Sequence, residues 1–154
     1  MLLGRFYNYW YLFLMQPLEA FELKAFILAL SQLDAPLPNT VQAKVNKITV
    51  TGDISKLYAI ATSYPPLAIA YDQAGEQLSA IAQFRSKGVS STPEYNPEPL
   101  NTEIDNAARD IQAELVILEE KINHNQLADA SIQIFNHSNS VQKAKDFFKA
   151  ILAN

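Results

Sequence analysis

The apolar pattern of residues 101–123 is the feature that most constrains how this chain can fold. Its apolar side chains recur at alternating intervals of four and three residues, and they are Ile104, Ala108, Ile111, Leu115, Leu118 and Ile122. This spacing places them on one stripe of an α-helix. Because such a stripe is buried against another element, the pattern predicts a long helix with a helical partner. Val116 and Ile117 lie off the stripe, so we expect the middle of this helix to contact two neighbours.

Residues 17–33 predict a second helix, which begins at Pro17 and ends before Pro36. Between Ala25 and Leu30 nearly the whole circumference of that helix is apolar. A helix without a polar face belongs in the interior of a protein. We therefore expect the 17–33 helix to lie inside the fold.

Residues 53–86 keep a three-four apolar rhythm that crosses Pro65-Pro66. Because proline cannot continue a helix without losing hydrogen bonds, we predict two helices, 53–64 and 66–86, joined at a bend. A less favoured interpretation places short strands within 67–84, with a hairpin turn from Asp72 to Gly75.

The segment before Gly52 predicts a short helix that begins near Asn39 or Thr40. Residues 45–51 form a strand in the alternative interpretation, because Ile48-Thr49-Val50-Thr51 alternates. Gly52 is expected to end the segment, and Asp53 to begin the next helix. Two further amphipathic helices are expected around 127–135 and 141–151.

Together these patterns predict an all-α fold, an irregular helical bundle of five to seven helices around one core. We expect an aromatic arm at 1–16 and a single helical domain at 17–154, with a Pro/Ser-rich connection at 88–100. A chain of 154 residues suits one domain. The 101–123 helix is expected to pack against the 53–86 pair.

Six aromatic side chains gather in the arm, and they are Phe6, Tyr7, Tyr9, Trp10, Tyr11 and Phe13. A membrane-spanning helix needs about 20 apolar residues, so this segment is too short to span. We favour packing of the arm on the domain or on a second copy. Translation beginning at Met15 and an interfacial membrane contact through residues 1–15 are less favoured, and a signal peptide is the least favoured.

Composition excludes several classes of function. The chain has no cysteine, so it has no disulfide framework and no thiolate metal site, which fits a reducing compartment and a cytoplasmic location. The net charge of −4 argues against general nucleic-acid binding. Glu120 and His124 are four residues apart, but two ligands are too few for a zinc site. His124 is instead expected at the C-terminal end of the long helix, and the carboxylates of 94–120 on a solvated face.

The leading hypothesis is a non-catalytic protein-protein interaction or scaffold module of unknown process, with a protein partner or a homodimer. No catalytic, cofactor-binding or metal-binding residue is predicted, and no cofactor is expected. The candidate interaction residues are Phe6, Tyr7, Tyr9, Trp10, Tyr11, Phe13, Val116 and Ile117. The alternative is a helical domain that binds a small apolar ligand or lipid in a pocket lined by Tyr58, Tyr64, Tyr71 and Phe84. An enzyme ranks third.

Overall fold

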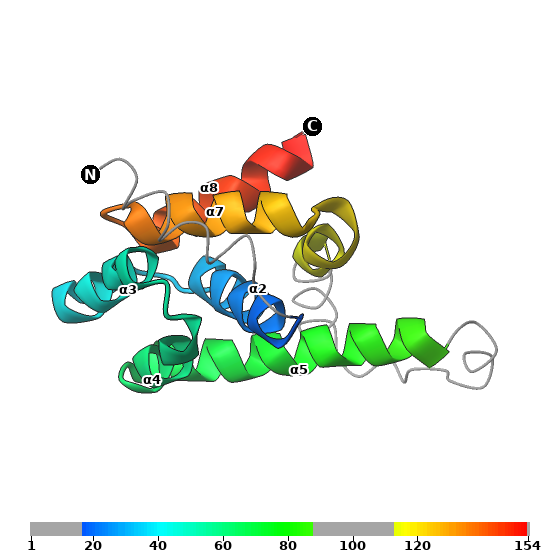
Figure 1. Cartoon of the computed structure of the whole chain (residues 1–154), viewed down its shortest axis with the longest axis horizontal. Coiled ribbons are helices and arrows are strands. Elements are labelled where there is room, and N and C mark those ends of the chain that lie inside the picture. The colour runs from blue at the N-terminus through cyan, green and yellow to red at the C-terminus, as the bar shows by residue number, and fades with distance from the viewer. Residues whose placement is uncertain (1–16, 88–112, 154) are drawn as a thin grey trace.

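The computed structural model describes residues 17–87 and 113–153, and helices dominate both ranges (Figure 1). The α-helices are α2 (Pro17–Ser31), α3 (Asn39–Thr51), α4 (Leu57–Thr62), α5 (Pro65–Lys87), α7 (His124–Asn136) and α8 (Ser140–Ala153). A short 3-10 helix, η1 (Ile54–Lys56), precedes α4, and a π-helical segment, η3 (Ile117–Lys121), precedes α7. No strand occurs in these two ranges, and the helices pack around a core, so the predicted all-α bundle is confirmed.

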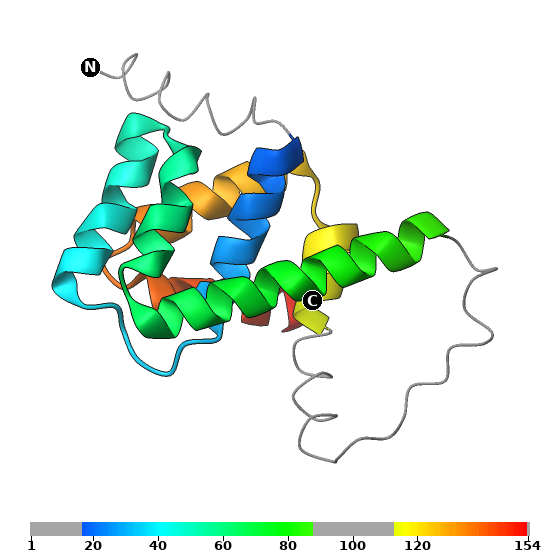
Figure 2. The ribbon, with the colours of Figure 1, turned by 90° about the horizontal axis from the view of Figure 1, so that it is seen from below.

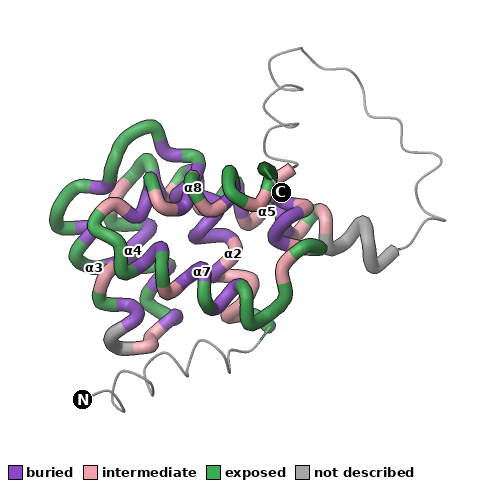
Figure 3. The backbone as a smooth tube through the Cα atoms, turned by 90° about the horizontal axis from the view of Figure 1, so that it is seen from above, coloured by how far each residue is buried: buried purple, intermediate pink, exposed green. Residues whose placement is uncertain are grey.

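Helix α2 lies at the centre of the described fold, where α5, α8, α7, α4 and η1 all contact it (Figures 1 and 2). Residues 25–31 are buried without interruption, and the tube in Figure 3 shows this concentration of buried positions. The predicted interior helix is therefore confirmed, although it ends at Ser31. At that end, the Lys145 ammonium on α8 donates a hydrogen bond to the Ser31 carbonyl oxygen at 3.0 Å. A cation in this position is stabilised by the helix dipole.

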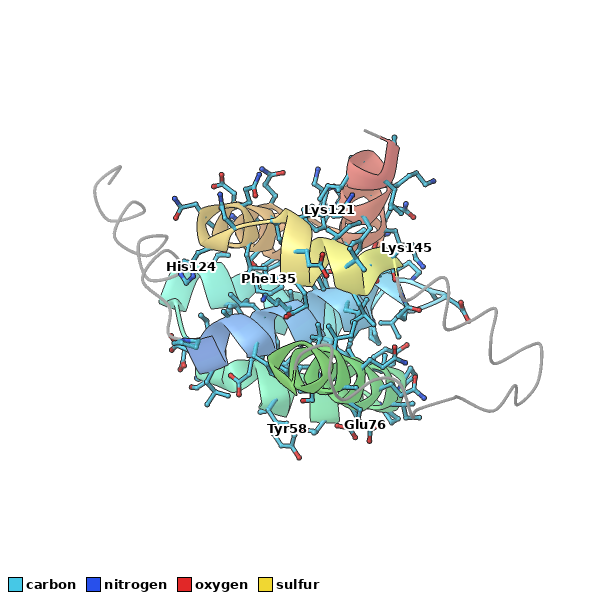
Figure 4. All side chains as sticks on the ribbon, turned by 90° about the vertical axis from the view of Figure 1, so that its right-hand side faces the viewer. Tyr58, Glu76, Lys121, His124, Phe135 and Lys145 are labelled. Atoms are coloured by element: carbon cyan, nitrogen blue, oxygen red, sulfur yellow. The ribbon has the colours of Figure 1, made fainter. Side chains whose placement is uncertain are left out.

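Phe26 joins three helices through its aromatic ring. Its centroid lies 5.7 Å from that of Phe135 on α7 and 5.9 Å from that of Tyr71 on α5, both in edge-to-face geometry. Figure 4 shows Phe135 between α7 and α2. Edge-to-face pairs stabilise the folded state beyond the effect of burying the rings, so Phe26 is a central contact of the core.

Both strand interpretations are wrong. Helix α3 continues through residues 45–51 and ends at Gly52, which has the left-handed φ of 69° and donates its N–H to the Ile48 carbonyl oxygen at 2.7 Å. The proline pair separates α4 from α5, as predicted. Pro65 is the first residue of α5, a position whose N–H has no partner within the helix, so a proline is tolerated there. Helix α5 then passes through Gly75 without a turn.

The described part of the 101–123 segment differs from the prediction at its C-terminal end. Residues 113–116 are α-helical, η3 ends at Lys121, and Ile122 is extended. Asn123 then begins α7 with a capping box: its side chain accepts from the Gln126 N–H, and its own N–H donates to the Gln126 side chain, both at 2.8 Å. His124 therefore begins a helix, and the prediction that it ends one is wrong. Residues 101–112 lie outside the described residues.

The side-chain amides of buried Gln42 and half-buried Asn46 hold α3 against the turn between α7 and α8. The Gln42 side chain donates to the His137 carbonyl oxygen at 3.1 Å and to the Ser140 hydroxyl at 2.8 Å, and it accepts from the Ser140 N–H at 3.0 Å. Asn46 donates to the Phe135 and His137 carbonyl oxygens. One helix therefore satisfies the polar backbone atoms of a turn about 90 residues away in sequence, which fixes their relative position.

We predict that Phe26→Ala lowers the free energy of unfolding by about 3–5 kcal/mol, because a large buried ring leaves a cavity that the helices cannot fill. Urea unfolding followed by circular dichroism measures the change. Ile69→Ala on α5 is the matched control, since 60% of the Ile69 side chain is exposed and its loss should cost no more than about 0.5 kcal/mol. Equal losses in the two variants would contradict the central position of Phe26.

We also predict that Gln42→Met lowers the free energy of unfolding by about 2–3 kcal/mol. Methionine keeps the length of the side chain but leaves the Ser140 N–H and the His137 carbonyl oxygen without this partner. Gln133→Met, at an exposed position of α7, controls for the loss of an amide. If both variants unfold at the wild-type urea midpoint, the amide network contributes nothing to stability.

Candidate interaction groove

A groove between α2 and α5 joins apolar side chains to charged groups. Its volume is about 510 Å³. The residues that line it are Leu18, Phe21, Glu22 and Ala25 of α2, and Tyr71, Asp72, Gly75, Glu76, Ser79 and Ala80 of α5. The α2 members follow helical spacing, as do the α5 members, so each wall is one face of a helix. We call this surface the α2–α5 groove.

Small side chains on α5 keep the groove open. A methyl group added to Gly75 would meet no atom within 4 Å, so the backbone of α5 is uncovered at this position. Ser79 and Ala80 continue the row of small residues. On the other wall, 69% of the Leu18 side chain is exposed, although it sits next to apolar neighbours. An apolar wall that stays exposed beside a row of small residues is typical of a surface that a further element can cover.

Three carboxylates surround this apolar lining, Glu22 on α2 and Asp72 and Glu76 on α5. Figure 4 shows Glu76 on the outer side of α5. Burial raises the pKa of the Glu22 carboxyl, and the negative charge of Glu19 raises it further. A raised pKa means that the ionised form of Glu22 is disfavoured where it lies. A cation bound in the groove would relieve that unfavourable free energy.

Tyr71 connects the groove to the core. Its ring contacts Phe26 on one side, and on the other its centroid lies 6.4 Å from that of Tyr58. Burial raises the pKa of the Tyr71 phenol to about 12, with further contributions from Glu22, Asp72 and Tyr58. Two of the three carboxylates that line the groove, Glu22 and Asp72, therefore act on Tyr71, which indicates a locally negative potential.

The structure places the residues singled out from the sequence in different surroundings. The six arm aromatics, Phe6 to Phe13, lie outside the described residues. Only 1% of Ile117 is exposed, so it belongs to the core of its own chain, whereas Val116 is half-buried. Tyr71 lines the groove, but Tyr58 is 61% exposed and points away from the body of the protein in Figure 4.

The carboxylates of the 113–121 segment fasten it to α2. Glu119 forms an ion pair with Lys24 at 3.1 Å, and Glu114 accepts a hydrogen bond from the Gln32 side chain at 2.7 Å. The expectation of a fully solvated acidic face is therefore wrong for Glu119, of whose side chain 14% is exposed. Within residues 17–87 and 113–153, no three His, Asp or Glu side chains converge in a way that could hold a metal ion.

Comparisons with known proteins give this chain no relative: no family model matches it, and no curated protein or solved structure matches it significantly. Among the described helices, none combines the length and the apolar character required to cross a bilayer. The site must therefore be interpreted from its own geometry and charge.

Tyr71 predicts a specific loss of stability at alkaline pH. In the unfolded chain a tyrosine loses its proton near pH 10, whereas folded Tyr71 retains it to about pH 12. The stabilisation of the folded state that follows from this difference in pKa is fully present below pH 10 and is lost as the pH rises from 10 to 12. For this half-exposed side chain, solvent screening reduces the expected loss to about 1 kcal/mol.

The measurement is the free energy of unfolding of wild type and Tyr71→Phe at pH 9 and pH 11.5. Phenylalanine keeps the ring contact with Phe26 but has no proton to lose. Wild type should lose about 1 kcal/mol more than the variant over this range, and Tyr64→Phe, which removes a phenol that does not act on the pKa of Tyr71, is the control. Identical pH dependence in wild type and Tyr71→Phe would contradict the prediction.

Proposed function

We propose that this protein is a non-catalytic interaction module that binds a basic amphipathic helix of a partner protein in the α2–α5 groove. The observation that carries the proposal is the combination of an open apolar trough with carboxylates on both walls.

The shape of the groove favours a helix as its occupant. Both walls are helix faces, and a third helix can lay one row of side chains into the trough between two others. Recognition of this kind uses an apolar stripe at positions i, i+3, i+4 and i+7 of the bound helix. Leu18 and Phe21 offer apolar contacts to such a stripe, and Gly75 lets it approach the backbone of α5.

The charge of the groove favours basic side chains beside that stripe. Lysine or arginine next to the apolar face would lie near Glu22 on one wall and near Asp72 and Glu76 on the other. Complementary charge guides orientation and speeds association more than it adds affinity. The partner chemistry is therefore a helix with one apolar face and basic flanks.

Two other interpretations have less support. A homodimer would place a second copy of the chain in the groove, and the arm residues 1–16 and Val116 are further candidates for contact. A small apolar ligand is less well supported, because Tyr71 shares the groove with three carboxylates and Tyr58 is largely exposed. Apolar ligand pockets enclose most of the ligand and contain few charged groups.

The test measures binding of a fluorescein-labelled 18-residue model helix with a leucine stripe and lysine flanks, by fluorescence anisotropy. A scrambled peptide of the same composition has the same charge but no stripe. We expect the patterned peptide to bind the full chain at least tenfold more tightly than the scrambled one, with an affinity that falls as salt is added.

Gly75→Leu places a side chain in the groove where nothing lies within 4 Å, so it should block the peptide and leave the core intact. Removing a helical glycine should also raise the free energy of unfolding by up to about 1 kcal/mol, which separates loss of binding from misfolding. Ile69→Leu on the same helix is the control. The proposal is wrong if Gly75→Leu binds as wild type does. A wild-type dimer in sedimentation that Gly75→Leu dissociates would identify a second copy as the occupant instead.

A further inference from the structure

A second recess lies between α3 on one side and η1 and α4 on the other. Its volume is about 310 Å³, and it is lined by Lys44, Lys47, Ile48, Lys56, Ala59 and Ile60. Two lysines come from α3 and the third from η1, so both walls carry a lysine. We call this recess the lysine cleft.

The charge of this part of the chain is opposite to that of the whole. Residues 39–62 contain three lysines and a single carboxylate, Asp53, whereas the chain as a whole carries −4. The three lysines all line the lysine cleft. An anion between Lys44 on one wall and Lys56 on the other would be attracted from both sides.

The floor of the lysine cleft is apolar. Ile48 and Ile60 close the base of the cleft but are only 1% and 5% exposed, so its exposed apolar lining comes mainly from Ala59 and the hydrocarbon stems of the lysines. Ala59 adds a methyl group on the α4 side. A fully hydrated ion such as free phosphate would use only the lysines, and the apolar floor would be left uncovered.

We propose that the lysine cleft binds a small amphipathic anion, with a carboxylate or phosphate head held by the lysine ammonium groups and a short hydrocarbon group against Ala59 and the lysine stems, above Ile48 and Ile60. The volume is at the lower end of the range for ligand pockets and suits a short chain. Lysine is well suited to such a head group because its ammonium acts as a compact, flexible point charge. The proposal is independent of the helix-binding function of the α2–α5 groove.

Nucleic acid fits this surface less well. Its affinity grows with the number of phosphates neutralised, and three lysines on an otherwise acidic chain give only a weak contribution. The head group could belong to a free metabolite-sized anion or to an anionic lipid in a bilayer. Both sources share the same chemistry, so the experiment has to separate them.

Isothermal titration of the full chain with octyl phosphate, below its micelle concentration, is compared with titration by inorganic phosphate. Burial of two methylene groups corresponds to about a tenfold gain in affinity, so octyl phosphate should bind at least tenfold more tightly. Exposed ion pairs are weak, so replacing one lysine should lower the affinity for octyl phosphate about two- to fivefold. The double variant Lys44→Gln/Lys56→Gln should lower it about tenfold. Lys44→Arg/Lys56→Arg should retain binding.

Lys149→Gln on α8 removes the same charge from an exposed position outside the cleft, and it should bind as wild type does. Equal affinity for octyl phosphate and inorganic phosphate would overturn the proposal, and so would an equal loss in Lys149→Gln and the double variant. Gly75→Leu should bind octyl phosphate normally, so failure of the groove and failure of the cleft are distinguishable.

Vesicles of phosphatidylcholine with and without phosphatidic acid identify the source of the head group. Binding to the acidic vesicles that Lys44→Gln/Lys56→Gln weakens about tenfold would assign the cleft to a lipid head group. Binding of octyl phosphate without binding to vesicles would assign it to a free amphipathic anion. Vesicle binding that the double variant does not change, with no binding of octyl phosphate, would overturn the proposal.

Discussion

The fold depends on burying residues 25–31 of α2 on every side. A helix with an apolar circumference cannot leave any face in water without loss of hydrophobic free energy, so several elements have to surround it. Helix α5 supplies one side, α7 and α8 another, and η1 with α4 a third. The arrangement follows from that requirement more than from any one pair of helices. The described residues of the 101–123 segment bury Leu115, Ile117 and Leu118 in the same core, and Glu119 and Glu114 join the segment to Lys24 on α2 and to Gln32 just after it.

Hydrophobic burial gathers the helices, but polar bonds fix their positions. Apolar contacts are non-directional, so they do not by themselves choose one rotation of α3 against the end of α7. The Gln42, Asn46 and Thr49 side chains make that choice by pairing with Asn136, His137 and Ser140 around the turn. Among the described residues, no buried side-chain nitrogen or oxygen lacks a partner. Buried polar groups that are fully paired specify one arrangement because every alternative leaves some of them unpaired.

Helix positions could be read from the sequence, because the three-four spacing and the proline and glycine breaks are local signals. Pro65 and Gly52 end or begin helices where expected. The role of Asn123 was missed, since an asparagine paired with Gln126 resembles any polar turn until its hydrogen bonds are seen.

The α2–α5 groove was not predicted either, because its walls are distant in sequence. Its signal was present in part: Asp72, Gly75, Glu76 and Ser79 lie on one face of a single helix. The lysine cleft likewise needs α3 and η1 to be folded against each other.

Rigidity distinguishes the two candidate surfaces. The α2–α5 groove is carried by the pair of helices with the most extensive mutual contact in the described fold, and Phe26 and Tyr71 link the two walls beneath it. A site on such elements keeps its shape before a partner arrives, so binding does not have to order the walls. The lysine cleft spans the joint at Gly52, where α3 gives way to η1, and its lysines are flexible. An ion held there would restrain that joint as well as the side chains. We therefore expect the groove to select its partner mainly by shape, and the cleft to select a ligand that joins an anionic head to a short hydrocarbon group.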